Sequence, residues 1–210
     1  MNKIDAISDM VIKSKRVVVF TGAGHSTESG ISDFRSPGGI WDRFDPADYT
    51  YQKFLSSEAN REKHWELAKS YYPVMANAKP NPGHYAIAEL HHIGKLDCVI
   101  TQNVDGLHQE SGIPEEKVIE LHGNLKWVIC LSCSKRYSRD EIQSRLESGE
   151  KSPKCGACGG IIKEATVSFG QPMPERATHE AQLRSASCDL FMVAGSSLVV
   201  YPAAQMPLIA

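Results

Sequence analysis

The stretch VVVFTGAGHS, residues 17–26, decides the fold class of this chain. Its first four residues, Val17–Phe20, are an unbroken apolar run, which is typical of a strand buried on both faces of a parallel sheet. Gly22 and Gly24 follow, and glycines at such a position let the backbone approach a ligand closely. We therefore expect a buried strand with a binding loop at its carboxyl end. Ser26 or Thr27 is expected to cap the next turn, whose free N–H groups suit a phosphate.

Working outward from this strand, three further apolar runs also end in small or polar residues. They are Cys98–Ile100 before TQNVDG, Val118–Leu121 before HG, and Leu190–Ala194 before GSS. The last run, LFMVA, is also expected to be buried on both faces. Helical patterns at about residues 58–72, 84–93 and 175–186 separate the runs. This alternation predicts an α/β fold with an open parallel sheet that binds ligands outside the carboxyl ends of its strands.

Composition excludes several classes of partner. The 210 residues carry a net charge of −2, which gives no electrostatic reason to expect direct binding to nucleic acid. No apolar run approaches the length of a membrane span, so we expect no membrane contact. The N-terminal residues form a short amphipathic helical pattern and lack a signal-peptide core. A cytoplasmic location is the resulting expectation.

Four of the six cysteines form two CxxC pairs, Cys130/Cys133 and Cys155/Cys158. Two such pairs favour one tetrahedral, structural Zn²⁺ over a pair of thioredoxin-like redox motifs, because neither pair opens a helix after a strand. The pairs lie in a segment, residues 126–162, that breaks the strand–helix pattern and contains the Gly- and Pro-rich stretch SGEKSPKCGACGG. We therefore predict a small zinc module inserted into a larger domain made of residues 1–125 and 163–210.

Polar residues crowd the ends of the predicted strands. Gln102, Asn103, Asp105 and His108 follow the second strand, and His122 ends the third. Taken singly, Asn103 and Asp105 could merely form a turn, and a lone His is more often structural. Several polar strand ends that converge on one edge favour a ligand site instead.

The motifs GAGHSTESGISDFR, TQNVDGLH, LHG, CLSC…CGAC, VSFGQPMP and GSSLVVYP occur here in the order and spacing of the sirtuins. From about residue 10 to its last residue, the chain resembles this family of NAD-dependent protein deacylases. The resemblance implies a Rossmann-like NAD-binding domain with helices on both faces of its sheet and a zinc-ribbon module beside it. It also implies that an acetyl-lysine protein or peptide binds in the cleft between the two, with NAD as co-substrate.

The resemblance also implies roles for individual residues. His122 is expected to be the general base, which an imidazole suits because its ordinary pKa lies near working pH. The peptide is expected to add as a strand between residues 166–170 and 198–202, although these two segments could instead pair only with each other. Residues expected to contact NAD are Gly22, Ala23, Gly24, Ser26, Asp33, Phe34, Arg35, Gln102, Asn103, Asp105, Gly195, Ser196 and Ser197. Residues expected to contact the peptide are Val167, Phe169, Gly170 and Val199.

The predicted reaction is NAD-dependent deacetylation of protein lysine, in which the acetyl group passes to ADP-ribose and nicotinamide is released. Mono-ADP-ribosyl transfer and a non-catalytic interaction module are the alternatives, and His122 favours the first reading. Ala68 and Tyr71 stand where the desuccinylase branch of the family has a Tyr and an Arg, so short neutral acyl groups are expected. The chain departs from the family pattern at His25, Ser32 and Gln171.

Family members normally continue past residue 210 with another strand. The resemblance therefore predicts that this chain lacks the C-terminal end of the family domain. In that case the edge of the sheet beside Leu190–Ala194 is open, and a partner chain is expected to cover it.

Overall fold

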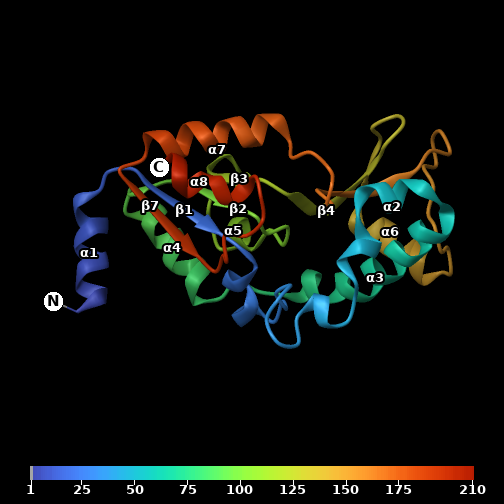
Figure 1. Cartoon of the computed structure of the whole chain (residues 1–210), viewed down its shortest axis with the longest axis horizontal. Coiled ribbons are helices and arrows are strands. Elements are labelled where there is room, and N and C mark those ends of the chain that lie inside the picture. The colour runs from blue at the N-terminus through green and yellow to red at the C-terminus, as the bar shows by residue number, and fades with distance from the viewer. Residues whose placement is uncertain (1) are drawn as a thin grey trace.

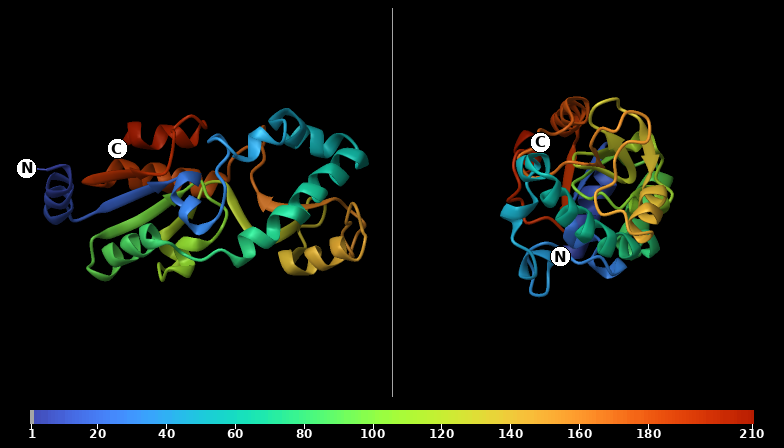
Figure 2. Two further views of the ribbon diagram at one scale, coloured as in Figure 1. Left: turned by 90° about the horizontal axis from the view of Figure 1, so that it is seen from below. Right: turned by 90° about the vertical axis from the view of Figure 1, so that its right-hand side faces the viewer.

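The computed structural model describes residues 2–210, which form two lobes (Figure 1). The large lobe contains a parallel sheet and carries both termini. The small lobe lies at the opposite end of the molecule and contains the helices α2 (Tyr51–Ser56), α3 (Glu58–Asn77) and α6 (Arg139–Glu147). Figure 2 shows from a second direction that both termini lie at the large-lobe end.

The sheet of the large lobe has four parallel strands in the order β3-β2-β1-β7. They are β1 (Val17–Thr21), β2 (Leu96–Thr101), β3 (Val118–Glu120) and β7 (Leu190–Ala194). Thr21, the last residue of β1, is in register with the last residues of β2 and β7. The carboxyl ends of these strands therefore meet at one edge, as the sequence predicts.

Helices cover both faces of this sheet, because successive residues of a strand point to opposite sides. On one face, Val17 and Val19 pack with Ile87 of α4 (Pro82–His92). On the other, Val18 and Phe20 pack with Ala181 of α7 (Glu175–Ser187) and with α8 (Met206–Ile209). The predicted α/β fold with helices on both faces is thus confirmed.

The expectation that LFMVA is buried on both faces is wrong for β7. This strand is half-buried, and the side chain of Val193 is 41% exposed. The physical reason is its place at the edge of the sheet, where within residues 2–210 it has β1 as its one neighbour. A partner chain that covers this edge stays a prediction.

The small lobe is built around an antiparallel sheet in the order β5-β4-β6. Its strands are β4 (Gly123–Cys130), β5 (Arg136–Ser138) and β6 (Ile162–Thr166). The core of this lobe joins Val128, Ile142 and Ile162 with Trp65, which comes from α3 and is fully buried. The predicted insert at residues 126–162 therefore shares its core with a helix that precedes it by far in the sequence.

Two further helices complete the set of α-helices within residues 2–210. The N-terminal helix α1 (Lys3–Lys13) begins at an Asn2 capping box and buries none of its residues. Helix α5 (Leu107–Glu110) follows β2 through a left-handed Gly106. None of the helices in residues 2–210 combines the length and the apolarity needed to cross a bilayer.

Candidate functional site

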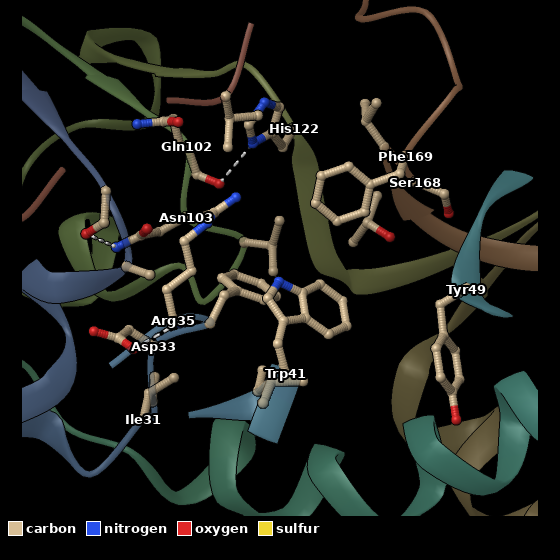
Figure 3. A pocket seen from close by; sticks show the side chains of 18 of the residues that line it. Ile31, Asp33, Arg35, Trp41, Tyr49, Gln102, Asn103, His122, Ser168 and Phe169 are labelled. Carbon is tan, nitrogen blue, oxygen red and sulfur yellow. Dashed lines mark hydrogen bonds between the residues drawn. The ribbon is translucent and has the colours of Figure 1, made fainter. Parts of the chain in front are cut away.

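One cavity of about 670 Å³ lies between the carboxyl edge of the parallel sheet and the small lobe. Its lining includes every residue that the sequence predicts for the base, NAD and peptide contacts, and Figure 3 shows several of them around the open space. These residues come from six separate stretches of the chain: Gly22–Ser26, Asp33–Arg35, Gln102–Asp105, His122, Val167–Gly170 and Gly195–Val199. The fold therefore brings together, in one site, residues that are far apart in the sequence.

Hydrogen bonds join the loops that follow β1 and β2. The Ser26 hydroxyl donates to the Asp105 carboxylate at 2.8 Å, and the Asn103 amide donates to the Ser26 hydroxyl at 3.0 Å and to the Gly22 carbonyl at 3.1 Å. The expectation that Ser26 or Thr27 caps the next turn is wrong. Neither side chain bonds the N–H groups there, since Ser26 is bound to the second loop and Thr27 donates back to the Gly24 carbonyl at 3.0 Å.

Glycines allow a third loop to pack against the first. The Gly24 N–H donates to the Gly195 carbonyl at 2.9 Å, and a Cβ on Gly22 would lie 2.9 Å from the same oxygen. Gly195 itself has a left-handed φ of 64°, and a side chain there would clash with the His25 backbone. The close packing of the loop after β1 against the loop after β7 thus requires these glycines, whether or not a ligand also requires them.

The geometry of His122 identifies its free nitrogen. Its Nδ1 lies 3.1 Å from the Gln102 carbonyl, which can only accept, so Nδ1 carries the proton and Nε2 keeps a lone pair. Burial lowers the pKa of His122 below its usual value, although the bond to the Gln102 carbonyl opposes this shift. The imidazole is therefore neutral near pH 7, with Nε2 able to accept a proton, and Figure 3 shows its other nitrogen bonded to the Gln102 carbonyl.

The segment that carries Asp33, Phe34 and Arg35 is held by its own hydrogen bonds. The Asp33 carboxylate accepts the backbone N–H of Ser36 at 2.8 Å and that of Arg35 at 3.1 Å. Hydrogen bonds from Ser36 lower the pKa of Asp33, whose carboxylate is therefore ionised at neutral pH. Asp33 thus shapes the loop that presents its two neighbours to the cavity.

An aromatic wall, formed by Phe34, Trp41 and Phe169, was missed by the sequence reasoning except for its first and last members. The ring centroids of Phe34 and Trp41 lie 5.3 Å apart, and those of Trp41 and Phe169 lie 5.8 Å apart. Trp41 belongs to a single 3-10 turn, Ile40–Asp42, which is too short to show a periodic pattern, so the sequence does not indicate that it is a cavity residue. Ala68 and Tyr71 of α3 also line the cavity, and the Tyr71 hydroxyl donates to the Ser32 carbonyl at 3.1 Å.

The two predicted peptide-binding segments do not pair with each other in residues 2–210. Instead, the Val167 N–H donates to the His122 carbonyl at 2.8 Å, and the Phe169 carbonyl accepts the Tyr51 N–H at 2.9 Å. The Ser168 N–H donates to the Gln171 side chain at 3.2 Å. The alternative in which residues 166–170 and 198–202 pair only with each other is therefore wrong.

His108 does not reach the cavity, although the sequence groups it with Gln102, Asn103 and Asp105. Helix α5 turns it inward, so that it is 1% exposed and its Nε2 lies 2.8 Å from the Thr21 hydroxyl. Burial lowers the pKa of His108 to about 3. Its expected role as a ligand contact of this cavity is thus wrong.

A buried charged group at the small-lobe side of the cavity was also missed. Glu164 of β6 accepts a hydrogen bond from His64 Nε2 at 2.6 Å, and Arg139 lies 3.7 Å from its other oxygen. Burial alone would raise the pKa of Glu164, but the neighbouring His64, Arg139 and Lys163 outweigh it and lower the pKa to about 2. These residues come from distant segments, so only the fold brings them together.

The four paired cysteines converge in the small lobe. Cys130 and Cys158 have their sulfurs 3.5 Å apart, those of Cys133 and Cys155 are 3.6 Å apart, and all four lie within 4.8 Å of one another. Tetrahedral Zn²⁺ with Zn–S bonds of about 2.3 Å needs sulfur separations of about 3.8 Å. The cluster therefore fits one structural Zn²⁺. All six cysteines are free of disulfides, and Cys98 is a buried residue of the sheet core.

Comparison with known proteins agrees with this geometry. The family model described as Sir2 family matches residues 22–202. An NAD-dependent protein deacetylase of Thermodesulfovibrio yellowstonii is 48% identical over 208 residues, which cover 99% of this chain and 80% of the relative. NAD-dependent protein deacetylase 1 of Bradyrhizobium diazoefficiens is 45% identical over 207 residues, with the same two coverages.

Solved structures extend the likeness to three dimensions. A Sir2 protein with a deacetylated p53 peptide and 3′-O-acetyl ADP-ribose superposes with a TM-score of 0.92 at 40% identity, over 99% of this chain and 82% of that one. A complex of Sir2 with a p53 peptide and NAD⁺ gives a TM-score of 0.88 at 39% identity, over 99% and 82%. The fold, the cavity and the sequence thus agree, and the chain belongs to the Sir2 family.

Proposed function

We propose that this protein is an NAD-dependent protein-lysine deacetylase. The observation that carries the proposal is the cavity, in which a neutral His122 faces the loops that follow β1, β2 and β7. Curated relatives of the same family, at 45% and 48% identity, bear this activity in their names. NAD is the co-substrate and an acetyl-lysine peptide is the acyl donor.

The NAD diphosphate and ribose would lie along the loop at residues 22–26 and the facing Gly195–Ser197. Ala23, Gly24 and Ser26 line the cavity there, and Arg35 brings a cation to the same cavity. Gln102 is placed on the ribose side, where its amide donates to the Ser196 hydroxyl at 2.8 Å. The adenosine end therefore lies toward β7.

The nicotinamide end would lie toward Asp105, with Asn103 beside it on the ribose side. Both side chains are already held by Ser26, so a bound carboxamide meets groups of fixed orientation. Fixed groups lose less conformational freedom on binding than mobile ones do. Phe34, at the side of the aromatic wall, would shield the reacting face of the ribose from water once nicotinamide has left.

His122 would act as the general base. The acetyl oxygen bonds to the anomeric carbon of the ribose as the bond to nicotinamide breaks. His122 Nε2 then accepts a proton from a ribose hydroxyl, which allows the acetyl group to pass to the sugar. The Gln102 carbonyl keeps the other proton on Nδ1, so Nε2 stays free to accept.

The peptide would bind as an extended strand between residues 166–170 and 198–202. Val167, Phe169 and Gly170 line the cavity from the first segment, and Val199 lines it from the second. Backbone pairing of this kind gives affinity with little demand on peptide sequence. The acetyl-lysine side chain would then pass along the aromatic wall toward His122.

The four-cysteine site would hold Zn²⁺ in a structural role. Four thiolates fill a tetrahedral ion, so no position remains for substrate. The metal supports β4 and the two turns that flank the sheet of the small lobe. It takes no part in the chemistry at His122.

Release of nicotinamide from NAD, measured with and without an acetyl-lysine peptide, tests the proposal. We expect release that depends on the peptide and is accompanied by loss of the acetyl group from lysine. Release that is independent of the acyl group, together with a gain of mass on the target protein, would show an ADP-ribosyltransferase instead. Absence of release under both conditions would leave a non-catalytic binding module.

A further inference from the structure

Three histidines gather behind the NAD loop, outside the cavity. His25 lies in the turn after β1, His84 in the first turn of α4, and His108 in α5. The ring centroids of His25 and His84 are 4.5 Å apart, those of His84 and His108 are 5.0 Å apart, and those of His25 and His108 are 5.4 Å apart. One ring nitrogen from each histidine lies within 4.8 Å of the other two.

Each of the three histidines has one buried ring nitrogen without a hydrogen-bond partner. His84 and His108 are 0% and 1% exposed, and His25 is half-buried. Nε2 of His25, Nε2 of His84 and Nδ1 of His108 are three of the five buried side-chain nitrogen or oxygen atoms that lack a partner in residues 2–210. Buried polar atoms are nearly always paired, and an exception often marks the place of an ion or a water molecule. Three exceptions at one point indicate a shared ligand.

The surrounding hydrogen bonds aim a lone pair of His108 at this point. Its Nε2 lies 2.8 Å from the hydroxyl of Thr21, which in turn donates to the Thr101 hydroxyl at 2.8 Å. Because the Thr21 proton is used in this way, His108 donates from Nε2, and its Nδ1 carries only a lone pair. This arrangement resembles that of metal-bound histidines, whose second nitrogen usually donates to an oxygen.

For His84 to bind a metal through Nε2, its ring proton must first shift from Nε2 to Nδ1. Its Nδ1 accepts the Asn81 N–H over a long 3.3 Å, which places the ring proton on Nε2. Binding of an ion through Nε2 transfers this proton to Nδ1 and ends that hydrogen bond. The α4 capping box keeps its other half, in which the Asn81 side chain accepts the His84 backbone N–H at 3.3 Å.

We propose that His25, His84 and His108 form a second metal site, which binds one divalent transition-metal ion independently of the four cysteines. Imidazole is a preferred ligand of Zn²⁺, Co²⁺, Ni²⁺ and Cu²⁺. Metal–nitrogen bonds of about 2.0–2.1 Å place tetrahedral ligands about 3.4 Å apart, so the rings need to close by roughly an ångström. A water molecule fills the fourth position. This site does not depend on the deacetylase activity proposed above.

An ion at this site would join the NAD loop to two helices. The His25 N–H donates to the Gly22 carbonyl at 2.9 Å, and the Asn81 side chain donates to the His25 carbonyl at 2.8 Å. A bond from the metal to His25 therefore fixes the turn at residues 23–25 against α4 and α5. We expect occupancy of the site to change the affinity for NAD.

Cobalt uptake by the full-length chain tests the proposal, since Co²⁺ reports its ligands by its spectrum. Protein that holds one Zn²⁺ at its four cysteines is dialysed against Co²⁺, and the amounts of bound Zn²⁺ and Co²⁺ per chain are then measured. We expect the wild type to take up one Co²⁺ while it keeps its zinc, with a tetrahedral absorption band and without thiolate charge transfer. The His25→Ala variant should take up none. The matched control His92→Ala removes an exposed histidine of α4 and should behave like the wild type.

A second variant keeps all three rings. A Cβ on Gly83 would lie 2.9 Å from His25 Cε1, so Gly83→Ala should displace the His25 ring and weaken Co²⁺ binding about 10–100-fold. Co²⁺ should raise the melting temperature of the wild type and of His92→Ala, but not that of His25→Ala. Uptake by His25→Ala equal to that of the wild type would overturn the site. No uptake by the wild type would overturn it too, and would assign the three nitrogens to a buried water.

Discussion

At the scale of single residues, His122 shows how one hydrogen bond selects the nitrogen that reacts. The proton on Nδ1 is held by the Gln102 carbonyl, so Nε2 is the acceptor. We expect His122→Ala to keep its fold and to lose deacetylation by about 10²–10⁴-fold, because one general base contributes about this much. Steady-state rates and circular dichroism measure the two effects. Activity within a few-fold of the wild type would contradict the assignment of the base.

The pH dependence of the wild type follows from the same residue. Burial lowers the pKa of His122 in the folded protein below the ordinary value of 6.5. Protonation removes the lone pair of Nε2, so activity should fall as the pH drops through this lowered pKa. The acid limb of kcat/KM should therefore lie below pH 6.5. A limb at or above that value would show that His122 is not the titrating base.

Ala68 and Tyr71, which line the cavity, bring no positive charge to an acyl group bound there. Ala68 offers no charge to an acyl carboxylate, and an unpaired buried carboxylate is strongly disfavoured. We expect acetyl-lysine peptides to be deacylated at least about tenfold more efficiently than succinyl-lysine peptides. Arg43 lines the same cavity, so the comparison is repeated with Arg43→Ala. Equal efficiency of the wild type on both peptides would refute the prediction, and the Arg43→Ala variant would then show whether Arg43 is the cause.

At the scale of elements, the turn after β7 requires glycine at position 195, because any side chain there would clash with the His25 backbone. Gly195 and Gly94 both have a left-handed φ, of 64° and 72°, but a Cβ on Gly94 meets nothing within 4 Å. Gly94→Ala should therefore cost only the strain of that conformation, about 1–2 kcal/mol. Gly195→Ala should cost clearly more and should also weaken NAD binding, as denaturant unfolding and calorimetry would measure. Equal losses in the two variants would contradict the clash with His25.

The small lobe should depend on its metal for folding. Metal-binding energy acts as folding energy in so small a unit, so chelation or Cys155→Ser should unfold this lobe first. Hydrogen exchange of β4 and α6 would report it, with Cys98→Ser as a control outside the cluster. An active and fully folded protein after exhaustive chelation would contradict the structural role of zinc.

Features of the fold that follow from local sequence patterns could be predicted, whereas features that depend on contacts between distant segments could not. Strands β1, β2 and β3 end in polar or glycine residues, and the two CxxC pairs have fixed spacing, so local patterns predict the sheet edge and the zinc site. The place of β7 at the sheet edge, Trp41 in the wall and the pairing of His64 with Glu164 depend on contacts between distant segments. No periodicity marks such contacts. The inward turn of His108 depends on Gly106, whose left-handed φ of 75° redirects the chain.

At the scale of the whole molecule, the charged group around Glu164 links the stability of the small lobe to pH. The pKa of Glu164 is about 2 in the folded protein, against an ordinary 4.5. A lowered carboxyl pKa stabilises the fold above pH 4.5, and this stabilisation is lost as the pH falls from 4.5 to 2. The free energy of unfolding should fall by a few kcal/mol over this window.

The Glu164→Gln variant separates this carboxylate from all others. It should be less stable at pH 7, by about 3–5 kcal/mol, because Arg139 and Lys163 lose their buried counter-charge. Its stability should also vary less between pH 4.5 and 2 than that of the wild type. Denaturant titrations at several pH values give both quantities. Parallel pH curves for the two proteins would show that Glu164 does not carry the effect.

The shared core of the small lobe has a consequence for how the chain folds while it is being made. Trp65 emerges from the ribosome early, yet its partners Val128, Ile142 and Ile162 emerge much later. At about 5–20 residues per second, the indole waits for roughly 5–20 s without its core. During this time α3 presents a large apolar side chain to chaperones and to other nascent chains. The order of synthesis therefore leaves this helix without its packing partners until most of the chain has been made.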